Sequence, residues 1–149
     1  MHAHLQTKLQ LAPTELFTHG ACHIYACALK RRFPNLQLRR AGSQIRDGVG
    51  TPSAEGQHVY CYADGVLLDV SRIIPEENLL KVYQWTAWDC TEDELFTVCQ
   101  ESEKGPLNRW RQYLDEEFIA RATSVADWHI SSRTEEIHSA LSDMKGRKV

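Results

Sequence analysis

Three residues of this chain carry side chains that together could do nucleophilic chemistry: Cys22, His58 and Asp69. The thiolate form of cysteine is the nucleophile, and a free thiol is mostly protonated at neutral pH, so a reactive cysteine needs its pKa lowered by its surroundings. A histidine within reach can take the thiol proton, and an aspartate can orient the imidazole. Attack of such a thiolate on a carbonyl carbon gives a thioester, which is acyl-transfer chemistry.

A helix predicted over residues 21–33 must position the thiol. Apolar side chains recur there at helical spacing, at Cys22, Ala26, Leu29 and Phe33. The pattern ends at Pro34, because the residue before a proline is biased out of helical backbone. Cys22 then lies in the first turn, where unpaired amides and the helix dipole favour a negative charge. Gly20 would let a substrate approach the backbone closely, and the amides of Cys22 and His23 could stabilise an oxyanion.

A hairpin predicted for His58–Ala63 and Val66–Ser71 must position the other two residues. The intervening Asp64-Gly65 favours a two-residue type I′ turn, which pairs Ala63 with Val66. In this register His58 and Asp69 share one face as diagonal neighbours, about 7 Å apart at Cα. The opposite face is apolar and is expected to face the core; it carries Val59, Cys61, Ala63, Val66, Leu68 and Val70.

Each of the three residues also has a simple structural explanation. A histidine on a strand is commonly structural, an aspartate near a turn often caps it, and a free cysteine packs well in a core. The prediction of a Cys-His-Asp triad therefore depends on the joint pattern. Among the other cysteines, Cys27 and Cys61 are expected to be core residues.

Several further residues are predicted to lie on the substrate side of the site. Gln44, in a glycine-rich loop, could supply a side-chain donor to an oxyanion. Trp85 and Trp88 could line a cleft beside the hairpin, although large aromatic residues more often pack in a core or at its rim. The complete predicted set of substrate-binding residues is Gly20, His23, Gln44, Tyr60, Trp85 and Trp88.

Composition restricts the class of protein. The 149 residues suit one domain, and 42% hydrophobic and 25% charged residues are typical of a globular protein. A formal net charge of -3 predicts no nucleic-acid partner. Five cysteines, with no Cys-x-x-Cys pair, argue against a disulfide framework and a zinc site, and we expect no metal and no cofactor.

The location of the protein is predicted from the same features. No apolar stretch is long enough for a signal peptide or a membrane span, so we expect a cytoplasmic protein without a membrane partner. Export or delivery without a cleavable signal stays open. The oligomeric state is not predicted.

The predicted fold class is α+β, with a central nucleophile helix packed on a small antiparallel sheet. Residues 14–74 are expected to form the catalytic core, and residues 75–145 a mostly helical completion of the same domain. Helices are predicted from Glu76 to about Tyr83, after a Thr91 N-cap with Glu94 completing a capping box, from Pro106 through Phe118, and from Thr134 onward.

The order of these residues resembles that of the papain-like cysteine hydrolase superfamily, above all its transglutaminase-like and arylamine N-acetyltransferase-like branches. Two stretches carry the resemblance: residues 20–26 (GACHIYA) and residues 58–70 (HVYCYADGVLLDV). It implies a papain-like core, a thioester on Cys22, His58 as general base and acid, and Asp69 as its orienter. Papain-like proteases carry a glutamine six residues before the cysteine, where this chain has Leu16.

Two functions are compatible with these patterns. The first is an amide hydrolase that acts on a protein or peptide: a glutamine deamidase, a protease or a transamidase, which differ in the acyl acceptor. By resemblance, compact thiol enzymes of this kind occur among bacterial effectors and toxins. The second is a non-catalytic protein-binding module on the same scaffold. Its helices after Thr91 would then present Trp110, Tyr113 and Trp128 to a partner.

Overall fold

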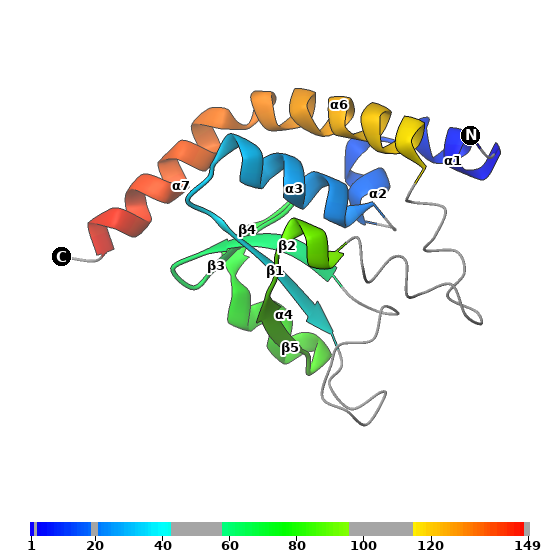
Figure 1. Ribbon diagram of the computed structural model, residues 1–149. Helices are drawn as coiled ribbons and strands as arrows, with labels where there is room; N and C mark the ends of the chain where they lie inside the picture. The colour runs from blue at the N-terminus through cyan, green and yellow to red at the C-terminus, as the bar shows by residue number, and fades with distance from the viewer. Residues whose placement is uncertain (2, 19–20, 43–57, 96–114, 148–149) are drawn as a thin grey trace.

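A computed structural model describes residues 1, 3–18, 21–42, 58–95 and 115–147 (Figure 1). The described part has an α+β fold built on a five-stranded antiparallel sheet with strand order β4-β3-β2-β1-β5. In chain order the elements are α1 (Ala3–Leu9), α2 (Pro13–Thr18), α3 (Cys22–Arg32), β1 (Gln37–Gly42), β2 (His58–Ala63), β3 (Val66–Leu68), β4 (Ile73–Pro75), α4 (Glu76–Tyr83), β5 (Thr86–Asp89), α6 (Glu116–Ser132) and α7 (Thr134–Arg147).

Helix α3 is the centre of the larger core. Every residue from Cys22 to Leu29 is buried, because the sheet covers one side of the helix and α6 covers the other (Figure 1). Small side chains allow this close packing on both sides, and the Cys61 thiol on β2 donates a hydrogen bond to the Ala26 carbonyl oxygen at 3.2 Å. The helix ends at Arg32, one residue before the predicted end, and Phe33 is its C-cap ahead of Pro34.

The β2–β3 hairpin has the predicted register. Ala63 pairs with Val66, and the turn residues Asp64 and Gly65 have φ of 49° and 86°, as a type I′ turn requires. The face that carries Val59, Cys61 and Leu68 packs against α3, as expected. Strand β3 is shorter than the predicted Val66–Ser71, because the chain turns at Asp69, whose amide donates to the Arg72 carbonyl oxygen at 3.0 Å.

The opposite face of the hairpin is also buried, which the alternating pattern did not predict. Helix α4 covers it with Leu79, which packs on Tyr60 and Leu67 in a second, smaller core. Glu76, at the start of α4, connects this layer to the sheet: it accepts from the Tyr60 hydroxyl at 2.6 Å and from Arg39 at 2.8 Å. These hydrogen bonds offset the free-energy cost of removing the Glu76 carboxylate from water.

Residues 75–145 are less purely helical than predicted. Helix α4 has the predicted bounds, and the Thr91 hydroxyl accepts from the Glu94 amide at 3.2 Å as the capping box requires. The chain between them, however, forms the edge strand β5, whose pairing with β1 aligns Trp88 with Arg40. The predicted helix from Pro106 falls mostly on residues outside the described ranges.

The C-terminal helices pack over α3. Helix α6 begins at Glu116, capped by the Asp115 side chain, which accepts from the Phe118 amide at 2.9 Å. Helix α7 begins at Thr134 as predicted. No helix within the described ranges is both long enough and apolar enough to cross a lipid bilayer.

Candidate active site

His58 and Asp69 make the contact that the hairpin register predicts. The imidazole Nε2 and the carboxylate Oδ2 are 2.9 Å apart, and only 12% and 6% of the two side chains are exposed. His58 is the first residue of β2 and Asp69 follows the last residue of β3, so the hairpin itself sets their spacing. The ring of His58 also packs beside that of Tyr60, with 5.6 Å between the ring centroids.

Asp69 is held by a tight turn as well as by His58. Its Oδ1 accepts from the backbone amides of Ser71 at 3.1 Å and Arg72 at 2.8 Å. Its Oδ2 accepts from the Arg72 guanidinium through Nη2 at 2.7 Å and Nε at 3.0 Å. Burial alone would raise the pKa of Asp69, but the bonds and charges of His58 and Arg72 outweigh it and hold that pKa well below its usual value. Asp69 is therefore an anion.

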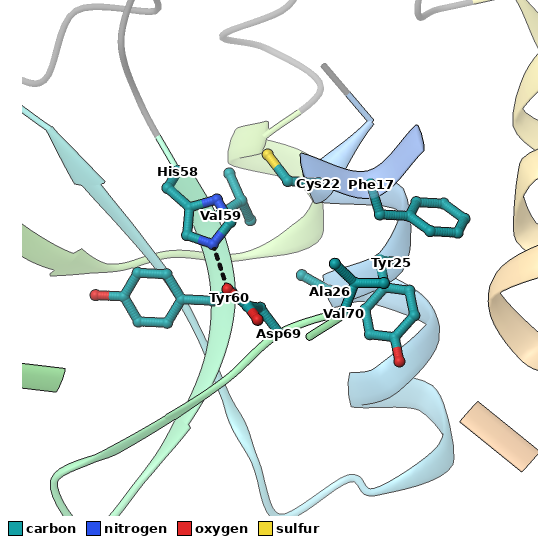
Figure 2. Close-up of a pocket in the computed structure, with 9 residues that line it drawn as sticks. All are labelled: Phe17, Cys22, Tyr25, Ala26, His58, Val59, Tyr60, Asp69 and Val70. Carbon is teal, nitrogen blue, oxygen red and sulfur yellow. Dashed lines mark hydrogen bonds and ion pairs between the residues drawn. The ribbon is translucent and has the colours of Figure 1, made fainter. Parts of the chain in front are cut away.

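Cys22 lies in the same pocket, at the start of α3. The pocket lies between α3 and the hairpin segments that carry His58 and Asp69 (Figure 2). Its lining residues are Phe17, Cys22, Tyr25, Ala26, His58, Val59, Tyr60, Asp69 and Val70. In Figure 2 the Cys22 sulfur lies toward the His58 ring, on the side away from the nitrogen that bonds Asp69. Helix α3 packs on the apolar face of the hairpin, and Cys22 and His58, each the first residue of its element, line the same pocket.

The Cys22 thiol is strongly acidic for a buried cysteine. Burial raises its pKa, but hydrogen bonds and positive charge from His23 and His58 outweigh burial and lower the pKa from 9.0 to about 5. Burial also lowers the pKa of His58, while its bonds to Asp69 and Cys22 and their negative charges raise it from 6.5 to about 9. Between these values Cys22 is a thiolate and His58 an imidazolium.

The other described cysteines differ sharply from Cys22. Burial raises the pKa of Cys27 and that of Cys90 to about 12, and raises that of Cys61 still further. These thiols are protonated at neutral pH and act as small apolar side chains, as expected for Cys27 and Cys61. The acidity of Cys22 thus comes from its two histidine neighbours and not from a general property of the core.

The start of α3 leaves backbone donors beside the thiol. Ala21 is the N-cap and makes no side-chain capping hydrogen bond. The amides of Cys22 and His23, in the first turn, have no acceptor within the helix. His23, predicted to contact substrate, is 2% exposed, and its imidazole lowers the pKa of the Cys22 thiol, so it belongs to the surroundings of that thiol.

The other residues predicted on the substrate side are dispersed. Tyr60 lines the pocket with its ring, but its hydroxyl is committed to Glu76 in the second core. Trp85 stacks on Tyr83 at 4.6 Å beneath the sheet, and Trp88 lies on β5; neither lines the Cys22 pocket. Gly20 and Gln44 lie outside the described residues.

Two arginines around Asp69 were not predicted. Arg72 follows Asp69 by three residues, and an aspartate that accepts from the amides two and three positions on is a recognisable turn signal. Arg133, the C-cap of α6, donates to the Asp69 carbonyl oxygen at 2.6 Å and to the Tyr25 hydroxyl at 2.8 Å. The Tyr25 hydroxyl is also hydrogen-bonded to His129 Nδ1 at 2.9 Å. No local pattern could reveal Arg133, since 64 residues separate it from Asp69.

No family model matches the chain, and neither a curated protein nor a solved structure matches it significantly. Within the described ranges, no three histidine, cysteine or acidic side chains gather in a way that could hold a metal ion.

Proposed function

We propose that this chain is a thiol-dependent acyl-transfer enzyme in which Cys22 is the nucleophile, His58 the general base and acid, and Asp69 the residue that orients His58. One combination of observations carries the proposal. A thiol with a pKa of about 5 shares a pocket with an imidazole whose Nε2 is hydrogen-bonded to a buried carboxylate at 2.9 Å. An acidic thiol, a bonded base and an orienting anion are the three parts that thiol catalysis requires.

In the first half of the proposed reaction the Cys22 thiolate attacks the carbonyl carbon of an amide. The carbonyl oxygen becomes an oxyanion, to which the amides of Cys22 and His23 in the first turn of α3 could donate. The tetrahedral intermediate collapses as the C–N bond breaks, and the His58 imidazolium gives its proton to the leaving nitrogen. The products are a thioester on Cys22 and a free amine or ammonia.

In the second half the neutral His58 takes a proton from the acceptor, either water or an amine. The acceptor attacks the thioester carbon, and the Cys22 thiolate leaves while His58 is again protonated. Asp69 stays ionised throughout and stabilises the imidazolium, and Arg72 and the turn amides keep its carboxylate in place. Water as acceptor makes the enzyme a deamidase or protease, and an amine makes it a transamidase.

The arrangement supports the expected relation to the papain-like superfamily. A buried helix that begins with the cysteine packs on an antiparallel sheet. Strand β2 supplies the histidine, and the residue directly after the neighbouring strand β3 is the aspartate. We propose on this basis that the core is papain-like, nearest in kind to transglutaminase-like enzymes, and that the substrate is a glutamine side chain or a peptide bond.

A second candidate function is a protein-binding module on the same scaffold. Two observations favour it: the pocket is too tight to hold a water molecule, and Trp128 on α6 is 67% exposed. An exposed tryptophan is typical of the anchors that dominate protein interfaces. Trp110 and Tyr113, the other residues predicted for such a surface, lie outside the described residues.

Product analysis of a treated proteome separates the two functions. A cell lysate is incubated with the wild type or with Cys22→Ala, and its peptides are compared by mass spectrometry. Conversion of glutamine to glutamate indicates deamidation, new chain ends indicate proteolysis, and new amine adducts on glutamine indicate transamidation. The proposal predicts one of these products in the wild-type sample alone. Identical samples, from a lysate in which both proteins are folded, would favour the binding module.

A further inference from the structure

Arg40 is the strand neighbour of Val59, which lines the Cys22 pocket, and is not used by the proposed mechanism. It pairs with Val59 of β2 on one side and with Trp88 of β5 on the other. Residues directly opposite one another in antiparallel strands point to the same face, so these three form one row across the sheet. Val59 lies on the face covered by α3 and lines the Cys22 pocket. Arg40 is therefore the next residue outward from the pocket, toward β5.

Two of the three guanidinium nitrogens of Arg40 lack the partners that the arginines around it have. Its Nε and Nη1 are both buried, and no described residue accepts a hydrogen bond from either. By contrast, Arg39 bonds Glu76 and Asp89, Arg72 bonds Asp69, and Arg133 bonds the Asp69 carbonyl oxygen. A buried cationic donor without an acceptor destabilises a protein, so such groups are usually matched by a ligand or a partner.

We propose that Arg40 binds a carboxylate of the substrate while Cys22 attacks a neighbouring amide. A guanidinium presents parallel N–H donors in a planar fork that matches a carboxylate, and a partly buried site strengthens this pairing. Trp88, partly buried in the same row, would contact the apolar part of that group. The inference rests on the proposed function and narrows its substrate to an amide with an acidic side chain or a terminal carboxylate close by.

Matched alkylating reagents test this inference without knowledge of the substrate. Iodoacetate and iodoacetamide differ by one carboxylate, and N-iodoacetylglycine and N-iodoacetylglycinamide place the same difference further from the reacting carbon. The rate of each reagent at Cys22 is measured by peptide mass spectrometry. The acid-to-amide rate ratio is then compared with the ratio for N-acetylcysteine in solution. We expect the Cys22 ratio to exceed the solution ratio by about tenfold for at least one pair.

Variants of the arginine identify the source of any preference. Arg40→Gln should return the ratio toward the solution value, and Arg40→Lys should retain only part of it, because an ammonium cannot form the fork. Arg32→Gln is the matched control: it removes the same charge from an exposed residue at the opposite end of α3 and should leave the ratio unchanged.

The rate ratio tests the role of Arg40, whereas the overall reactivity of Cys22 tests the proposed function. A wild-type ratio no higher than in solution, or an equal ratio in wild type and Arg40→Gln, would overturn the role of Arg40 and leave the reactive thiolate intact. Slow reaction of Cys22 with all four reagents, at the rate of Cys27, would instead contradict the proposed function. A wild-type ratio no higher than in solution overturns the role of Arg40 even if Arg40→Gln does not fold. A raised wild-type ratio that Arg40→Lys leaves unchanged overturns it as well, because the fork would then not be its source.

Discussion

Replacing His58 with alanine should make Cys22 a much weaker acid. Burial, assisted by nearby acidic side chains, raises the pKa of Cys27 and of Cys90 to about 12, yet the equally buried Cys22 has a pKa of about 5. Cys22 is therefore more acidic than these buried neighbours by about seven orders of magnitude, and the imidazoles of His23 and His58 are the groups that lower its pKa. Each imidazole contributes both a hydrogen bond and a charge.

The expected pKa of Cys22 in His58→Ala follows from the contributions of the two imidazoles. Loss of one of two comparable partners should remove about half of the effect, which raises the pKa of Cys22 in His58→Ala to about 8 or above. The rate of alkylation changes less than the thiolate fraction, because a more basic thiolate is intrinsically more nucleophilic. We expect the rate near pH 6 to fall on the order of tenfold, while the inflection of the rate-against-pH profile moves by about three pH units.

The assay is the pH dependence of iodoacetamide labelling at Cys22, read by peptide mass spectrometry. Labelling of Cys27 in the same samples is an internal control for unfolding, since that thiol reacts only when the core opens. His138→Ala, which removes an exposed imidazole at the edge of α7, is the matched control and should keep the inflection near 5. An inflection near 9 in the wild type, or one unchanged in His58→Ala, would refute the reasoning.

Three further changes have expected results. Asp69→Asn removes the negative charge that stabilises the imidazolium, so the pKa of His58 should fall below its value of about 9 in an NMR titration; an unchanged value would exclude Asp69 as the orienting anion. Gly65→Ala forces a side chain to adopt a φ of 86° in open space, which should cost about 1 kcal/mol in urea unfolding, and no loss would mean that the turn can rearrange. Arg133→Leu removes the donor to the Asp69 carbonyl oxygen and one of the two partners of the Tyr25 hydroxyl, so the free energy of unfolding should fall by about 1–3 kcal/mol. The exposed Arg121–Glu117 pair supplies its control, because Arg121→Leu should change stability by less than about 0.5 kcal/mol.

Local patterns predicted the elements whose ends are marked by strong signals. Pro34 ended α3, the Asp64-Gly65 turn set the register of β2 and β3, and Thr91 capped the helical turn at residues 92–95. Each of these features depends on a few neighbouring residues. The contact between His58 and Asp69 was predictable for the same reason, since one hairpin carries both residues.

Features that depend on distant partners were not predictable from one sequence. Strand β5 is short and becomes a strand only because β1 offers it a free edge. The second core forms because α4 folds back on the face of Tyr60, which alternation alone assigns to the polar side of the hairpin. Arg133 reaches Asp69 through the packing of α6 on α3, and no spacing rule encodes that distance.

Acylation of Cys22 by an activated ester tests the central claim most directly. Mixing the protein with p-nitrophenyl acetate should release a burst of nitrophenolate stoichiometric with protein, with the acetyl group recovered on Cys22 as a hydroxylamine-sensitive thioester. His58→Ala should show a slower burst, and Cys22→Ala none. An equal burst in Cys22→Ala, or acetyl groups recovered only on other side chains, would contradict the assignment of Cys22 as the nucleophile.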